Sequence, residues 1–204
     1  MHNFIRTYCT PFKKFVPNDI ELHLKKKSLY KRYMKYLKRY FFIYLKGQKD
    51  LEVFSILPND KNILWINISA PSLGDSLMDL SSRILLENKK IDLYTDKKNE
   101  HIYQQDIFFN KIYTRFVDLS KNQYDLVIID SYSTRSIRIK SKVAFNTKYV
   151  GMFGYFNGPE VNRTLFSFYQ MNNLLGNVLS GDKCDVLSKI SITISKSDKK
   201  IIDS

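Results

Sequence analysis

The sequence predicts an α/β fold: a Rossmann-like parallel sheet flanked by helices, with a basic helical extension before it. From residue 61, short apolar segments alternate with segments of helical periodicity, which is typical of β-α-β units. The apolar segments are continuous runs, as expected for strands covered on both faces. The length of 204 residues and the 44% hydrophobic content favour one domain with an extension over two full domains.

The expected elements follow each other in a regular order. Residues 1–60 are expected to form the basic amphipathic helical extension and residues 61–195 the Rossmann-like domain, and residues 196–204 are a tail or the start of a missing further domain. The link from residue 177 onward is predicted to be polar, before a period-two strand at 190–195. The strands are predicted at 62–68, 91–95, 111–116, 124–130 and 148–152, and the helices at 77–88, 99–105, 136–145 and 162–175, the last closed by Gly176.

The extension carries most of the charge. Residues 1–60 hold 13 Lys and Arg against 5 Asp and Glu, or +8 of the +13 of the whole chain. A helix over 20–46 is predicted to end at Gly47. Its apolar stripe consists of Leu22, Leu29, Tyr33, Leu37, Phe41 and Tyr44. Its membrane- or anion-facing basic residues are Lys25, Lys26, Lys27, Lys31, Arg32, Lys35, Lys38 and Arg39.

Two interpretations of this helix stay open from the sequence. It can lie in the headgroup region of an anionic membrane, since it is basic and rich in Tyr and Phe. It can equally dock on the domain with its lysines in water. The apolar runs are too short to span a bilayer and no signal peptide is visible, so cytoplasmic residence is the default. Cys9 and Cys184 have no metal spacing, and we expect no metal and no cofactor.

The turn after the first strand is the first candidate site. Ligands of open α/β sheets bind beyond the carboxyl ends of the strands, and the segment 69–75 occupies that position. We expect Gly74 to supply a positive φ or a close approach to a ligand. Asp75 is either a helix N-cap or a general base that takes a proton from a hydroxyl. The turn has no G-x-G-x-x-G, which argues against a dinucleotide there.

Two further segments follow later strands. After the strand 124–130, Asp130 leads into a helix with Arg135 and Arg138, residue types suited to phosphate. A glycine- and aromatic-bearing loop at 151–158 follows the next strand and can line a sugar site or turn the chain.

Four segments together resemble the N-terminal half of the heptosyltransferase family, glycosyltransferase family nine. They are "ILWINISAPSLGD", "YDLVIIDSYSTRS", "KYVGM" and "NRTLFSFYQMNNLLG". The resemblance implies half of a metal-independent, inverting GT-B enzyme of lipopolysaccharide core synthesis, with ADP-heptose as a typical donor and a phosphorylated glycolipid as acceptor. It implies Asp75 as the catalytic base. It implies acceptor contacts by Ser72, Gly74, Asp130, Arg135 and Arg138.

The sequence departs from that pattern in two ways. Ala70-Pro71 lengthens the turn before Asp75, and the chain ends at Ser204, about where a nucleotide-sugar domain would begin. We therefore expect little transfer by this chain without a donor domain or a second chain, as for a truncated or split gene product. A non-catalytic module that holds an anionic glycolipid or a partner chain is the alternative. Nucleic-acid binding is a third interpretation, from the net charge of +13 and the mixture of Lys and Tyr at residues 25–46, and no recognised nucleic-acid motif supports it.

Overall fold

A parallel five-stranded sheet forms the centre of the protein in this computed structural model, which describes residues 29–119, 123–152 and 162–190. The strand order is β3-β2-β1-β4-β5, and all neighbouring strands are parallel. The predicted α/β class is thus confirmed. The strands are β1 (Asn62–Asn67), β2 (Lys90–Thr95), β3 (Lys111–Tyr113), β4 (Leu126–Ile129) and β5 (Tyr149–Gly151).

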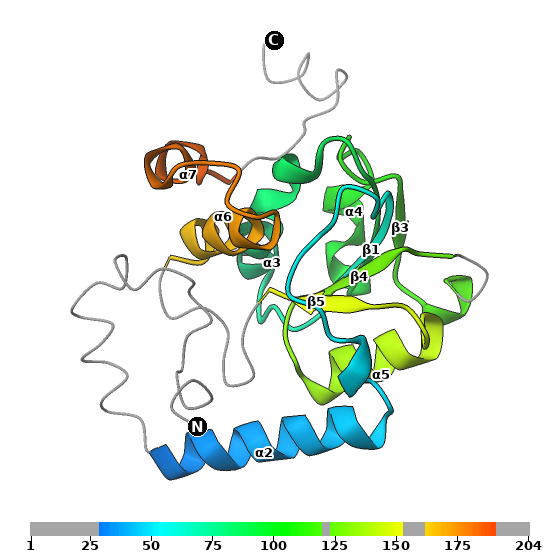
Figure 1. Cartoon of the computed structure of the whole chain (residues 1–204). Helices are drawn as coiled ribbons and strands as arrows, with labels where there is room; N and C mark the ends of the chain where they lie inside the picture. The colour runs from blue at the N-terminus through cyan, green and yellow to red at the C-terminus, as the bar shows by residue number, and fades with distance from the viewer. Residues whose placement is uncertain (1–28, 120–122, 153–161, 191–204) are drawn as a thin grey trace.

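Helices cover both faces of this sheet (Figure 1). The α-helices are α2 (Leu29–Leu45), α3 (Leu73–Asp79), α4 (Glu100–Tyr103), α5 (Thr134–Val143), α6 (Arg163–Leu174) and α7 (Gly181–Leu187). Short 3-10 helices are η2 (Lys49–Leu51), η3 (Ser81–Leu86), η4 (Lys97–Asn99) and η5 (Phe116–Asp118). Within the described residues, no helix is long and apolar enough to cross a membrane.

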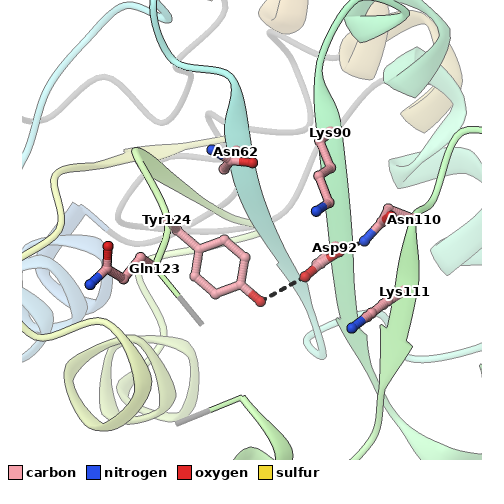
Figure 2. A pocket seen from close by; sticks show the side chains of 7 residues that line it. All are labelled: Asn62, Lys90, Asp92, Asn110, Lys111, Gln123 and Tyr124. Atoms are coloured by element: carbon pink, nitrogen blue, oxygen red, sulfur yellow. Dashed lines mark hydrogen bonds between the residues drawn. The ribbon is translucent and has the colours of Figure 1, made fainter. Parts of the chain in front are cut away.

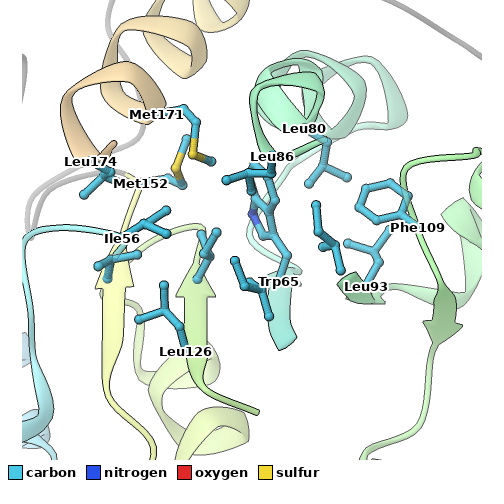
Figure 3. Packing of buried hydrophobic residues seen from close by; sticks show 14 of the residues in the cluster. Ile56, Trp65, Leu80, Leu86, Leu93, Phe109, Leu126, Met152, Met171 and Leu174 are labelled. Atoms are coloured by element: carbon cyan, nitrogen blue, oxygen red, sulfur yellow. The ribbon is translucent and has the colours of Figure 1, made fainter. Parts of the chain in front are cut away.

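The alternation of side chains along β1 builds two separate cores. Ile63 and Trp65 point to the face covered by η3 and α6, where they pack with Leu80, Leu93 and Met171 (Figure 3). Leu64 and Ile66 point to the opposite face. There they pack with Ile43 of α2, with Ile137 and Val143 of α5, and with Tyr149. The sheet is therefore buried on both faces, as its continuous apolar strands require.

The segment before β1 packs on the domain. Ile43 is fully buried, and α2 lies against α5. Glu52 forms a parallel bridge with Tyr149 of β5, and Ile56 joins the core beside Leu174. Of the predicted helix 20–46, residues 20–28 lie outside the described residues. Gly47 ends α2 with a φ of +62°, as predicted.

Several predicted boundaries were wrong. The helix predicted at 77–88 begins earlier, as α3, because Ser72 caps it, and continues after Asp79 as η3. The strands β3, β4 and β5 are shorter than predicted. The link after Gly176 contains α7, which Ser180 caps and which buries Cys184 beside α6. The strand predicted at 190–195 lies almost entirely outside the described residues.

Lys140 is buried in the layer between α5 and β5. Its Nζ donates to Oε1 of Gln48 and to the carbonyl oxygen of Phe145 at 3.1 Å, and it lies 5.0 Å from the centre of the Tyr149 ring. These partners are uncharged, and burial lowers the pKa of Lys140 to about 7. The charged form of this side chain therefore costs folding free energy.

We predict that the free energy of unfolding rises with pH because of Lys140. Between about pH 7 and about pH 10 the unfolded chain holds this proton and the folded chain does not, so stability increases by up to about 1.4 kcal/mol per pH unit. Lys140→Met removes this increase, whereas the exposed neighbour Lys142→Met keeps it. Urea unfolding across this range measures the slope. Equal slopes in the Lys140→Met variant and the wild type contradict the prediction.

We predict that Gly151→Ala destabilises the fold. A Cβ at Gly151 would lie 2.4 Å from Cε2 of Tyr132, whose ring is buried, so the ring must move at a cost of about 1–3 kcal/mol. Gly74→Ala is the matched control, since its Cβ would meet only Oγ of Ser72 at 3.8 Å. Urea unfolding compares the two variants. Equal free energies of unfolding for Gly151→Ala and Gly74→Ala would contradict the close packing of Tyr132 on Gly151.

Candidate active site at the carboxyl edge of the sheet

The strand order reverses between β1 and β4, and the turns that follow these two strands meet there. In open α/β sheets this switch point opens a crevice beyond the carboxyl ends of the strands. The β1 turn leads into α3 with Asp75, and the β4 turn leads into α5 with Arg135. The topology thus brings the two predicted segments to one edge. We call this region the carboxyl edge.

The Asp130 carboxylate joins the two turns. One oxygen accepts from the backbone N–H groups of Ile68 (2.8 Å) and Ser69 (2.5 Å), and the other from the N–H of Ser131 (2.6 Å) and the hydroxyl of Ser136 (2.9 Å). The side chain is only 1% exposed. Burial raises the pKa of the Asp130 carboxyl, and the N–H groups of Ser69 and Ile68 act against that rise. These four hydrogen bonds hold the turn after β1 against the turn after β4. Contact between Asp130 and a substrate stays a prediction.

Asp75 is the third residue of α3 and forms a capping box with Ser72, which is the N-cap. Its backbone N–H donates to Oγ of Ser72 at 3.2 Å, and its Oδ2 accepts from the N–H of Ser72 at 3.1 Å and from the hydroxyl at 2.7 Å. The side chain is 22% exposed, and its other oxygen lies 3.5 Å from Nε of Arg163. The expected N-cap role of Asp75 was wrong, because Ser72 is the N-cap and Asp75 is its partner at the third helical position. Because Oδ1 has a single, long protein contact among those described, it keeps room to accept a substrate proton.

Of the two roles offered for Gly74, a positive φ or a close approach by a ligand, the positive φ is not observed. Gly74 lies in the first turn of α3, and the described glycines with positive φ are Gly47 and Gly176. A capped helix begins at Leu73, so the backbone there is helical and needs no special residue. The space around Gly74 is nevertheless open, because a Cβ would meet only Oγ of Ser72. A close approach by a ligand stays a prediction.

Arg163 and Asp79 belong to this edge but were missed from the sequence. Nε and Nη2 of Arg163 bind the two oxygens of Asp79 at 2.8 and 2.5 Å, and the same guanidinium lies beside Asp75. Burial raises the pKa of Asp79 to about 7, although the ion pair with Arg163 opposes the rise. Asp75 and Asp79 are four residues apart, so they share a helix face. That spacing was the only signal available in the sequence.

Arg135 and Arg138 lie near the same edge on α5. Nη1 of Arg135 donates to the carbonyl oxygen of Ile68 at 3.1 Å, and Nη2 pairs with Asp96 at 2.6 Å. Its side chain is 59% exposed. Arg138 is exposed almost one turn further along the helix. Both can meet an anion from solvent, and phosphate binding by them stays a prediction.

The predicted basic residues of the extension are partly described. Lys31, Lys35 and Lys38 are exposed, and Arg39 is half-buried near the carboxyl edge. Burial lowers the pKa of Arg39, and the negative charge of Asp130 raises it. Lys25, Lys26 and Lys27 lie outside the described residues.

A polar hollow lies at the opposite, amino edge of the sheet (Figure 2). Its volume is about 80 Å³. Asp92 forms its floor, accepting from Nδ2 of Asn110 at 2.7 Å and from the hydroxyl of Tyr124 at 2.9 Å. Lys90 and Lys111 stand on its rim. The Asp92 carboxylate is thus already bound by protein donors, and the hollow is at the edge where α/β sheets do not carry their chemistry.

Comparisons with known proteins give no family for this chain. No known protein family matches the sequence, and no curated protein matches it. A solved structure with a similar chain trace is a glycosyl transferase of family 9 from Veillonella parvula, with a TM-score of 0.48 and 12% identity. The match covers 70% of this chain and 48% of that one, so this chain spans about half of its length. A likeness at this level defines neither a family nor an activity.

We predict that Arg163→Met destabilises the protein most at neutral and higher pH. Without Arg163 the buried Asp79 carboxylate loses its ion pair, so ionising it costs more, by up to about 1.4 kcal/mol for each pH unit above about 7. The pKa of Asp79 then rises above about 7, so stability is present at low pH and is lost as pH rises through the new value. Unfolding at about pH 5 and about pH 8 measures this difference. The exposed Arg115→Met is the control, and a deficit independent of pH contradicts the prediction.

Proposed function

We propose that this chain is the acceptor-binding domain of a heptosyltransferase-like glycosyltransferase of lipopolysaccharide core synthesis. The acceptor is a phosphorylated glycolipid, and the donor is a nucleotide sugar such as ADP-heptose, held by a further domain or a second chain. In this proposal the sugar transfer takes place at the cytoplasmic face of the inner membrane, where the glycolipid acceptor lies. The observation that carries it is the position of Asp75: a partly exposed carboxylate at the switch point, beside the guanidinium of Arg163.

The proposed chemistry uses the oxygen of Asp75 that faces Arg163. Oδ1 takes the proton from an acceptor hydroxyl, and the hydroxyl oxygen forms a bond to the anomeric carbon of the donor. The bond from that carbon to the donor phosphate breaks, and the nucleoside diphosphate leaves with the electron pair. The capping box holds Oδ2 on Ser72, so the free lone pairs of Oδ1 keep one orientation.

The cationic side chains have a separate role in the proposal. Arg135 is exposed at the end of β1 and Arg138 follows on α5, so both can meet phosphate groups of the acceptor. Arg163 keeps the Asp75 and Asp79 carboxylates together in spite of their like charges. Binding of the acceptor would thus use α5, whereas the proton transfer would use α3.

A non-catalytic binding module is the second candidate. The observation that favours it is the capping box itself, because Ser72 and Asp75 already satisfy each other as structural groups. In that case the edge would hold an anionic glycolipid through Arg135 and Arg138 without a reaction. The two candidates differ in what Asp75 does, not in where the ligand lies.

We predict that Asp75→Asn lowers kcat for sugar transfer by about 10²–10⁴-fold when a nucleotide-sugar domain is present on the same or a second chain. The affinity for a delipidated, phosphorylated core oligosaccharide, measured by titration calorimetry, should change by less than about tenfold, since binding depends on Arg135 and Arg138. Asp182→Asn is the matched control, an exposed Asp in the first turn of α7.

The outcomes separate the two candidates. Transfer by Asp75→Asn at a near wild-type rate rules out Asp75 as the base. Oligosaccharide binding by the wild type, with no transfer when the donor domain is supplied, supports the binding module.

A further inference from the structure

The helix α2 has two apolar faces, and only one of them packs on the domain. Ile43 is buried in the core on one face of the sheet, and Phe42 packs partly buried against that core. Tyr36 is also buried, and its ring stacks on Tyr40. Four residues of the stripe predicted from the sequence have described side chains, and these four do not dock on the domain. Tyr33, Leu37, Phe41 and Tyr44 are exposed, and they belong to a larger group of exposed apolar side chains on α2. This outer face of α2 consists of Tyr30, Tyr33, Met34, Leu37, Phe41, Tyr44 and Leu45, with exposures from 37% to 70%.

The outer face is continuous along the helix. Its members follow at spacings of one, three or four residues, so they form one strip on the side away from the domain. Figure 1 shows α2 as the outermost layer beneath α5. Seven large apolar side chains in one strip exceed the scattered exposed apolar residues of an ordinary surface, and such a patch marks an interaction site.

The charges beside the outer face indicate what covers it. Lys31, Lys35 and Lys38 are exposed and recur at spacings of four and three, so they line one flank of the strip. Lys46 follows at the C-terminal end, and there is no Asp or Glu from Leu29 to Lys46. If α2 packed on α2 of a second copy, the lysines of the two helices would come together, and neither helix carries an acid. A surface of negative charge has the complementary sign.

The aromatic composition favours a lipid surface among the anionic partners. Tyr30, Tyr33 and Tyr44 carry an apolar ring with a polar hydroxyl, which suits the boundary between headgroups and acyl chains. Phe41, Leu37 and Leu45 supply the apolar area that enters that boundary. We infer that the outer face of α2 binds the surface of an anionic bilayer, with the helix lying in the plane of the membrane.

In this orientation the membrane-bound helix α2 lies along α5 and reaches toward the carboxyl edge. The 17 residues of α2 span about 26 Å and the 10 of α5 about 15 Å, and α2 extends beyond the N-terminal end of α5 (Figure 1). That end of α5 lies at the carboxyl edge. Arg39 of α2 lies near the same edge, because the negative charge of Asp130 raises its pKa. The inference does not depend on the proposed transfer chemistry, because it concerns α2 alone.

Flotation of the full chain with vesicles tests the inference. We expect binding to phosphatidylcholine vesicles that contain phosphatidylglycerol, and at least about tenfold weaker binding to phosphatidylcholine alone. Phe41→Ser with Tyr44→Ser, and separately Lys31→Glu with Lys38→Glu, should each weaken binding by at least about tenfold. All four side chains lie on the surface of α2, and circular dichroism checks that each variant is folded.

Matched controls remove the same kinds of side chain elsewhere. Phe54→Ser with Ile107→Ser deletes two exposed apolar side chains, and Lys61→Glu with Lys111→Glu reverses two exposed charges. Both controls should bind as the wild type does.

Three results overturn the inference. One is no binding of the wild type to anionic vesicles, and a second is equal loss in the controls. The third is a wild-type dimer in solution that Phe41→Ser with Tyr44→Ser converts to a monomer without any vesicle binding, which identifies a second copy as the occupant. Asp75→Asn should bind vesicles normally, so failure of the transfer proposal and failure of this one are distinguishable.

Discussion

The arrangement of the carboxyl edge depends on one buried carboxylate. Asp130 accepts from two N–H groups after β1 and from an N–H and a hydroxyl after β4. A buried carboxylate is costly unless donors surround it, and here four donors do so. Since the donors come from both turns, the two turns at the switch point have a fixed relative position. Asp75 and Arg135, which follow these two turns, are therefore held in a fixed position relative to each other.

Two carboxylates that the sequence assigned to the same candidate site have different environments. Asp130 is enclosed, and its bonds organise the backbone; Asp75 is partly exposed, and one of its oxygens has a single long contact to Arg163. Such a difference between neighbouring acids is typical of sites where one group positions and another reacts. Asp79 adds a third environment, with its carboxyl paired to Arg163 in the interior. The function of the carboxyl edge therefore depends on Asp75 and on the ligand that reaches this side chain.

The fold was predictable because strands that are buried on both faces have continuously apolar sequences. The runs at β1 and β4 are continuously apolar, and the sheet indeed covers them on both faces. The contact of Arg163 with Asp79 was not predictable, because it joins residues 84 positions apart. The helix α7 escaped prediction because it has few apolar residues and packs through Cys184 and the hydroxyl of Tyr169. In α2, periodicity revealed an apolar stripe but not which stripe would dock.

The location of the ligand site is the central claim, and the amide spectrum of the labelled chain tests it most directly. A delipidated, phosphorylated core oligosaccharide should shift the amide resonances of Ile68, Ser69, Asp75 and Arg163, together with those of the turn after β4. The resonances around Asp92, at the opposite edge of the sheet, should stay unchanged. Shifts confined to the Asp92 hollow, or no shifts at a saturating concentration, contradict the assignment of the carboxyl edge as the acceptor site.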